Sequence, residues 1–125
     1  MTGIVMVTHG DLGEAFRKQA EDILGVPPGV TTVSVNYDAD PDQTEADLQA
    51  ALANSADSGG VVVLTDLPGA TPHNLAAQVA RSMNVPLVSG LNLPMLLKAI
   101  NHGDKPATEL ARVAARGARQ GVTGP

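Results

Sequence analysis

The chain has 125 residues and a formal net charge of −5, from 13 acidic and 8 basic residues. It contains no cysteine, which excludes disulfides, thiolate metal sites and cysteine nucleophiles, and its acidic balance argues against nucleic acid as a partner. We expect one domain, 1–125, with a short flexible tail from about residue 121. No apolar run approaches the ~20 residues that span a bilayer, and the first residues lack the basic and apolar segments of a signal peptide, so we expect none. A cytoplasmic protein without direct membrane insertion is therefore expected.

Apolar runs alternate with amphipathic stretches along the whole chain. The run at 3–8, "GIVMVT", is apolar on both faces and predicts a buried strand, as does "GGVVVLTD" at 59–66. In chain order, the pattern predicts a strand at 3–8, a helix at 11–24, a strand at 30–35, a helix at about 40–55, a strand at 59–66, a helix from Thr71, a short strand at 85–90, and helices within 92–100 and 106–120.

Residues suited to helix ends mark several of these boundaries. Gly25 is placed to end the first helix. Asp40 is a suitable N-cap for the second helix, and Gln43 three residues later suggests a capping box. Thr71 is a suitable N-cap for the third helix, with Pro72 as its first residue, and the last two helices are expected to repeat this cap-then-proline opening.

Near-continuous apolar strands that alternate with helices are typical of a parallel sheet covered on both faces. We therefore expect a three-layer α/β/α fold with a mainly parallel central sheet of four to five strands. His9 and Asp66 each stand at the carboxyl end of an apolar strand. Ligands in such folds bind at the carboxyl ends of the strands, so the two side chains share one crevice if their strands are neighbours.

His9 and Asp66 together suggest nucleophilic chemistry. A neutral imidazole is a nucleophile at one ring nitrogen while the other keeps its proton. A carboxylate bonded to that N–H holds the tautomer and stabilises the imidazolium that forms. The alternative is that His9 is only a polar residue of a surface loop.

The stretch "LPGATPHN" is a candidate anion site. Gly69 allows close backbone approach, Thr71 supplies a hydroxyl, and the helix start at residues 72–74 offers backbone N–H groups at the positive end of a helix dipole. We count Thr71, Gly69, His73 and Asn74 as candidate phosphate-binding residues, although the side chain of His73 is expected to point to solvent. An ordinary helix cap is the alternative. An anion site beside a nucleophilic imidazole indicates phosphoryl transfer.

Other cofactor chemistry finds no support in the sequence. His102 is interpreted as a turn residue, and no two histidines have the spacing of a helical metal motif, so no metal is expected. Neither the dinucleotide nor the P-loop glycine motif is present, so no cofactor is expected, and the phosphoryl group must come from another phosphorylated donor.

Three segments, "GIVMVTHGDLGEAF", "VVVLTDLPGATPHNLA" and "VSGLNLPMLLKAI", together resemble the enzyme IIA component of the mannose-type bacterial sugar phosphotransferase system, over 3 to about 120. The resemblance implies that His9 is phosphorylated, that Asp66 orients its ring and that Thr71 contacts the phosphoryl group. It also implies a phosphocarrier HPr as donor, a IIB component as acceptor and a homodimer. One departure lies on the expected docking surface, where Leu67-Pro68 replaces a frequent tryptophan-glycine pair.

Four other interpretations share parts of this pattern. Histidine phosphatases place an arginine before the histidine, where this chain has Thr8, and small metal chelatases usually continue with Ser-Arg rather than Asp11-Leu12. The phosphotransfer subunit of dihydroxyacetone kinase prefers SHS and DLGS. A regulatory protein that binds a partner, without sugar transport, needs His9 equally. The chain shows no IIB domain, so a transport role depends on a separate IIB protein.

Overall fold

The computed structural model describes residues 1–125 and contains one four-stranded sheet, all of whose strands are parallel. Its order is β2-β1-β3-β4. The strands are β1 (Gly3–His9), β2 (Val30–Val35), β3 (Val61–Thr65) and β4 (Leu87–Ser89). The parallel α/β architecture predicted from the apolar runs is confirmed, with four strands, and β1 and β3 are neighbours.

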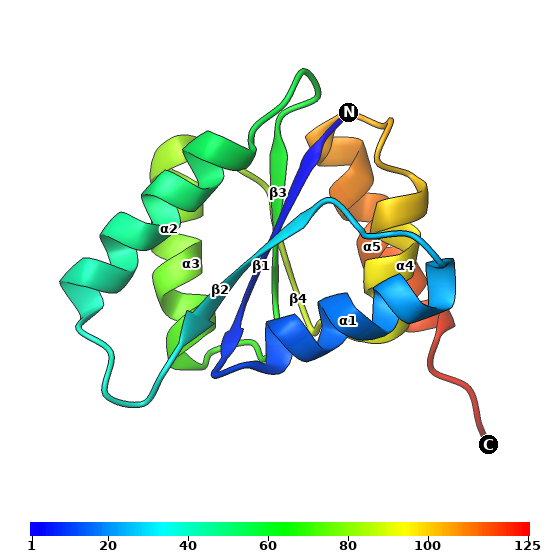
Figure 1. Cartoon of the computed structure of the whole chain (residues 1–125), viewed down its shortest axis with the longest axis horizontal. Helices are drawn as coiled ribbons and strands as arrows, with labels where there is room; N and C mark the ends of the chain where they lie inside the picture. The colour runs from blue at the N-terminus through cyan, green and yellow to red at the C-terminus, as the bar shows by residue number, and fades with distance from the viewer.

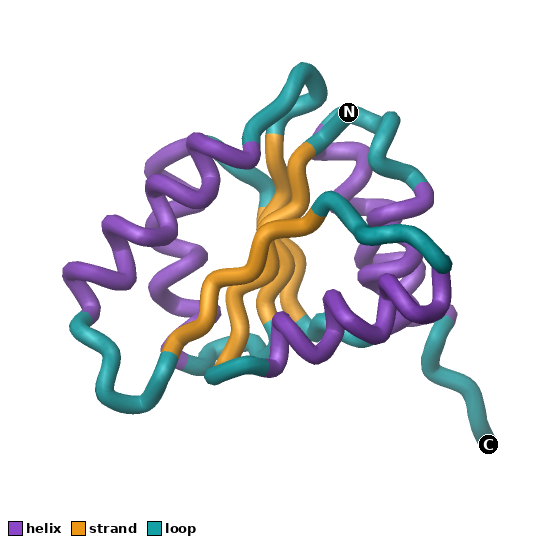
Figure 2. Tube along the Cα trace, viewed as in Figure 1, coloured by secondary structure: helices purple, strands orange, loops and turns teal.

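Five helices cover both faces of this sheet. In Figures 1 and 2, α2 and α3 lie on one side, and α1, α4 and α5 lie on the other. None of the helices has the length and apolar character needed to cross a membrane. Their bounds are α1 (Leu12–Leu24), α2 (Pro41–Ser55), α3 (Thr71–Met83), α4 (Leu93–Asn101) and α5 (Ala107–Gln120).

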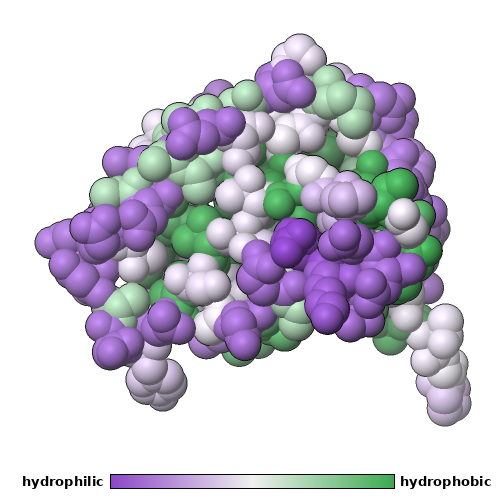
Figure 3. All heavy atoms as spheres, viewed as in Figure 1, coloured by the Kyte–Doolittle hydropathy of each residue, from purple (hydrophilic) through white to green (hydrophobic).

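The core consists of two apolar layers, one on each face of the sheet. Side chains alternate along a strand, so Ile4 and Met6 pack in the layer under α4 and α5, while Val5 and Val7 pack in the layer under α2 and α3. All four are essentially buried. Hydrophilic side chains gather over the outer sides of α1 and α2 in Figure 3, as amphipathic helices require.

The predicted helix ends are confirmed in part. Gly25 ends α1 in the left-handed conformation, and Asp40 caps α2 by accepting a hydrogen bond from the N–H of Asp42. The capping box is wrong, because Gln43 donates to the side chain of Asp47 instead.

Two further cap predictions need correction. Thr71 is the first residue of α3 rather than its cap, since Ala70 occupies that position and makes no side-chain cap bond. The opening of α5 follows Pro106 and also has no side-chain cap, whereas Asn92 caps α4 through the N–H of Met95. The hydroxyl of Thr71 is therefore not used as a helix cap.

The order of the strands places a topological switch point between β1 and β3. The chain leaves β1 through α1 on one face of the sheet and leaves β3 through α3 on the other face. The loops that follow these two neighbouring strands therefore diverge, which is where ligands bind in open parallel sheets. His9 ends β1 and Asp66 directly follows β3, so both stand at this switch point.

Candidate functional site

His9 and Asp66 are in direct contact at the carboxyl end of the sheet. The ring Nδ1 of His9 lies 2.7 Å from Oδ2 of Asp66, and the backbone N–H of His9 donates to the same oxygen at 2.9 Å. The Asp66 side chain is only 7% exposed, whereas that of His9 is 49% exposed. A buried carboxylate therefore fixes the orientation of an accessible imidazole.

The electrostatics of this pair determine which ring nitrogen is free. Burial alone raises the pKa of Asp66, but the hydrogen bonds from the backbone and ring of His9, with the charge of that ring, bring the pKa below its ordinary value. An ionised carboxylate only accepts hydrogen bonds, so Nδ1 of His9 carries a proton. In the neutral ring, Nε2 then keeps its lone pair and is the nucleophilic atom.

The turn after β1 is built by its own short sequence, "THGDLG". The buried Thr8 accepts a hydrogen bond from the N–H of Gly13 at 2.8 Å, which supports the start of α1 in place of Asp11, whose side chain makes no cap bond. A Cβ at Gly13 would lie 3.1 Å from that hydroxyl. Gly10 has φ +49°, a conformation that favours glycine, and its N–H donates to Val35. These contacts hold His9 at the carboxyl end of the sheet.

A pocket of about 510 Å³ opens beside His9. Its other walls come from the loop after β2 and from the start of α3, and they include Thr71 and Pro72. Asn74 already donates its N–H to Ala70, and proline has no N–H, so the free N–H groups of this helix start are those of Thr71 and His73. The pocket therefore combines an accessible imidazole with the positive end of a helix.

The candidate residues of "LPGATPHN" occupy different places. Thr71 reaches the pocket of His9, but the other three candidates are not among its lining residues. Gly69 turns the loop with φ +81° and accepts a hydrogen bond from the side chain of Asn74 at 3.0 Å, so these two residues brace the loop. The ring of His73, expected to point to solvent, instead bonds the hydroxyl of Thr65 at 3.0 Å and is partly buried.

One wall of the pocket was not predicted from the sequence. Val35, Asn36 and Tyr37 line it from the loop that follows β2. Tyr37 is the only tyrosine of the chain, and its side chain is fully exposed. The position of these residues at the carboxyl end of β2 could have indicated this wall, because β2 pairs with β1 and Val35 lies beside His9 in the sheet.

Comparisons with known protein families and curated proteins give a consistent result. Residues 3–115 match the family described as the fructose IIA component of the phosphotransferase system, EIIA-man. The mannose-specific EIIAB component of Escherichia coli K12 is 30% identical over 95% of this chain, and the chain spans 38% of that protein's length. The fructose-specific EIIA component of Bacillus subtilis is 26% identical over 81% of this chain and 70% of that protein.

Comparison with solved structures supports the same family and fold. A mannose/sorbose-specific IIA subunit of the phosphotransferase system from Enterococcus faecalis superposes with a TM-score of 0.88 at 26% identity. The match covers 99% of this chain and 94% of that subunit.

Proposed function

The chain belongs to the EIIA-man family of phosphotransferase-system IIA components, and on this premise we propose that it is a phosphohistidine carrier whose acceptor atom is Nε2 of His9. One observation supports the choice of atom. Nδ1 of His9 lies 2.7 Å from a buried Asp66 whose pKa is lowered, which leaves Nε2 as the available nucleophile. IIA components of this system are phosphotransferases in sugar uptake, and the exposed imidazole fits that role.

The proposed step needs no proton to move. The lone pair of Nε2 attacks the phosphorus of a phosphohistidine on the donor, which is a phosphorylated HPr. A new N–P bond forms as the donor's N–P bond breaks, and the electron pair of that bond stays on the donor's ring nitrogen. The ring of His9 becomes positively charged while Nδ1 keeps its proton. The carboxylate of Asp66 compensates that charge.

The start of α3 is proposed to hold the transferred group. The hydroxyl of Thr71 has no partner in the protein and lines the pocket of His9, and the N–H groups of Thr71 and His73 are free. Donors at a helix start stabilise phosphoryl oxygens without having to reorganise. Gly69 and Asn74 take part through the shape of the loop rather than by contact with the phosphoryl group.

The surroundings of the pocket suit docking of another protein. Tyr37 in its lining and Leu67 beside Asp66 both expose large apolar side chains. Exposed apolar groups around a reactive centre are typical of protein-binding surfaces. We therefore place HPr here as donor and a separate IIB component as acceptor, and these partners make the cytoplasm the site of action.

The decisive experiment is phosphorylation by the complete donor chain. The protein is incubated with labelled phosphoenolpyruvate, enzyme I and HPr, and acid-labile, base-stable label is measured. His9→Ala should carry no label, because it has no nucleophile. His102→Ala is the matched control, because it also removes a histidine, at the C-terminal end of α4. This variant should be labelled as in the wild type. Label that persists in His9→Ala overturns the proposal.

A further inference from the structure

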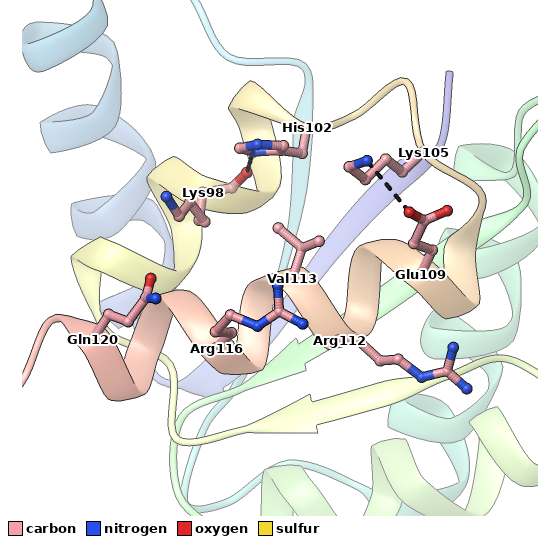
Figure 4. Close-up of a pocket in the computed structure, with 8 residues that line it drawn as sticks. All are labelled: Lys98, His102, Lys105, Glu109, Arg112, Val113, Arg116 and Gln120. Atoms are coloured by element: carbon pink, nitrogen blue, oxygen red, sulfur yellow. Dashed lines mark hydrogen bonds and ion pairs between the residues drawn. The ribbon is translucent and has the colours of Figure 1, made fainter.

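A second hollow lies away from the pocket of His9, between α4, α5 and the loop that joins them. It has a volume of about 320 Å³ and shares no lining residue with the pocket of His9. Figure 4 shows Val113 pointing into the space between the two helices and the guanidinium of Arg116 beside it, while Lys98 and Arg112 extend from opposite ends of the lining. Different helices line the two hollows, since α4 and α5 cover the opposite face of the sheet from α3.

The charge of this hollow is opposite to that of the whole chain. Its lining includes Lys98, Lys105, Arg112 and Arg116, which are half of the 8 basic residues of a chain with net charge −5. Its single carboxylate, Glu109, is already paired with Lys105 at 3.3 Å. Lys98, Arg112 and Arg116 have no carboxylate within 4.0 Å, although the chain has 13 acidic residues.

The packing of α4 against α5 places these cations in one lining. Gly117 lies at the contact, where a Cβ would come within 2.8 Å of the Cβ and Cγ of Lys98. The absence of a side chain at Gly117 lets the two helices approach and places the stem of Lys98 on α5. Arg112 and Arg116 are four residues apart, so both emerge on one side of α5. In Figure 4 the guanidinium of Arg116 lies beside Val113, and that of Arg112 lies at the outer rim.

We propose that this basic hollow binds a small ligand with two or more oxyanion charges, of the class of phosphorylated metabolites. The lining carries three cations without a carboxylate partner, which is more charge than a monoanion can neutralise. The planar guanidinium groups match the geometry of phosphate oxygens, while Lys98 supplies a point charge. The volume is at the small end of ligand pockets, which suits a compact phosphate compound rather than a nucleotide pair or a folded partner.

The site is independent of the chemistry at His9. The ligand class follows from the charges of α4, α5 and the loop between them alone, and the lining of the hollow includes neither His9 nor Asp66. Binding would neutralise repulsion between cations on adjacent helices, so the bound ligand stabilises the α4–α5 pair.

Inorganic pyrophosphate is the probe for this site. It is titrated into ¹⁵N-labelled protein at constant ionic strength, and amide shifts are followed by NMR. We expect saturable shifts in the second half of α4 and along α5. Arg116→Glu should weaken binding at least tenfold, and Lys98→Gln should weaken it severalfold. The matched control Arg81→Glu, at an exposed and unpaired arginine on α3, makes the same charge change and should alter affinity less than twofold.

Three results would overturn the proposal. The first is a set of shifts that sodium chloride of equal ionic strength reproduces. The second is equal weakening by Arg81→Glu and Arg116→Glu, which indicates general electrostatic attraction to the protein. The third is a set of shifts confined to His9, Thr71 and their neighbours, which places the anion in the phosphoryl pocket and leaves the proposed function standing.

Discussion

Oδ2 of Asp66 accepts two hydrogen bonds from one residue, and this double contact fixes both the backbone and the ring of His9. The backbone bond holds the end of β1 to the residue that follows β3, and the ring bond selects the tautomer. The other oxygen, Oδ1, is buried without a hydrogen-bond partner, which costs stability. A carboxylate kept charged under these conditions is typical of a functional site rather than of a packing contact.

Asp66→Asn tests the charge of this pair with little change in shape. The amide oxygen can still accept both bonds from His9, but it cannot compensate an imidazolium. A hydrogen bond to a charged group contributes about 1.5–3 kcal/mol, so phosphorylation by HPr should slow about 10- to 100-fold. The rate is measured by rapid quench, and far-UV circular dichroism verifies folding. Asp22→Asn, at an exposed carboxylate on α1, is the control and should react at the wild-type rate. A folded Asp66→Asn variant with wild-type rate would refute the role of Asp66.

Thr71→Val removes the pocket hydroxyl and keeps the size of the side chain. If that hydroxyl bonds the phosphoryl group mainly in the transition state, transfer should slow by roughly one to two orders of magnitude. Stability should change little, because Thr71 caps no helix. Thr108→Val, the same substitution on the exposed first turn of α5, is the matched control for transfer and melting. Transfer at the wild-type rate by Thr71→Val would exclude a contact between its hydroxyl and the transferred group.

At the scale of elements, the start of α1 and the contact between α4 and α5 determine where the residues of the two hollows lie. The start of α1 depends on Thr8, a residue of the preceding strand, so β1 and α1 form one rigid unit around His9. The contact of α4 with α5 depends on Gly117, where the helices approach too closely for a side chain. Thr8 lies outside the helix that it supports, and Gly117 has low helix propensity. The reason for each residue is therefore a contact with a neighbouring segment rather than its local helix preference.

Gly117→Ala is a direct test of that helix contact. Alanine within an isolated helix is favoured over glycine by about 1 kcal/mol. Here its Cβ would meet the stem of Lys98, and overpacking of this kind costs about 1–3 kcal/mol, so we expect a net loss of stability. Denaturant unfolding measures it. Gly29→Ala, where nothing lies within 4 Å of the added Cβ, should leave stability unchanged or slightly raised. A stabilised Gly117→Ala variant would show that α4 and α5 do not need this close approach.

At the scale of the whole molecule, the sheet ends in an open edge at β4. The outer edge of this strand has no partner strand, and its Leu87 and Val88 are only half-buried. Both line a hollow of about 510 Å³ along this edge, together with Ala115 and Ala118 of α5 and with Val122. A second copy that covers this edge would bury apolar surface and satisfy an exposed strand.

We therefore expect a homodimer in solution. A chain of this size with only 2% aromatic residues gains stability from additional buried apolar area. Multi-angle light scattering at micromolar concentration should give twice the monomer mass, and dilution should show a single transition to monomer. Val88→Lys, which places a charge at the edge, should shift that transition to higher concentration. A monomer mass throughout the micromolar range would refute the dimer.

The sequence by itself determined the parallel α/β class, the position of every strand within a few residues, and His9 and Asp66 as the polar residues at the ends of two strands. These features are local: continuous apolar runs, Gly25 and Asp40 at helix ends, and polar residues directly after strands. Local patterns also explain the failures. Thr71 and Gln43 are residue types that often cap helices. In the structure, however, Ala70 occupies the N-cap position of α3, and the side chain of Gln43 donates a hydrogen bond to Asp47 on the same helix.

Only the tertiary structure decided which side chains meet. The contact between His9 and Asp66 joins residues 57 positions apart, and it exists because β1 and β3 are adjacent in the order β2-β1-β3-β4. The same packing turned His73 towards Thr65, brought Tyr37 to the pocket and gathered cations between α4 and α5. Propensity and periodicity act over a few residues, whereas these contacts depend on how helices and strands pack, which no single stretch of sequence encodes.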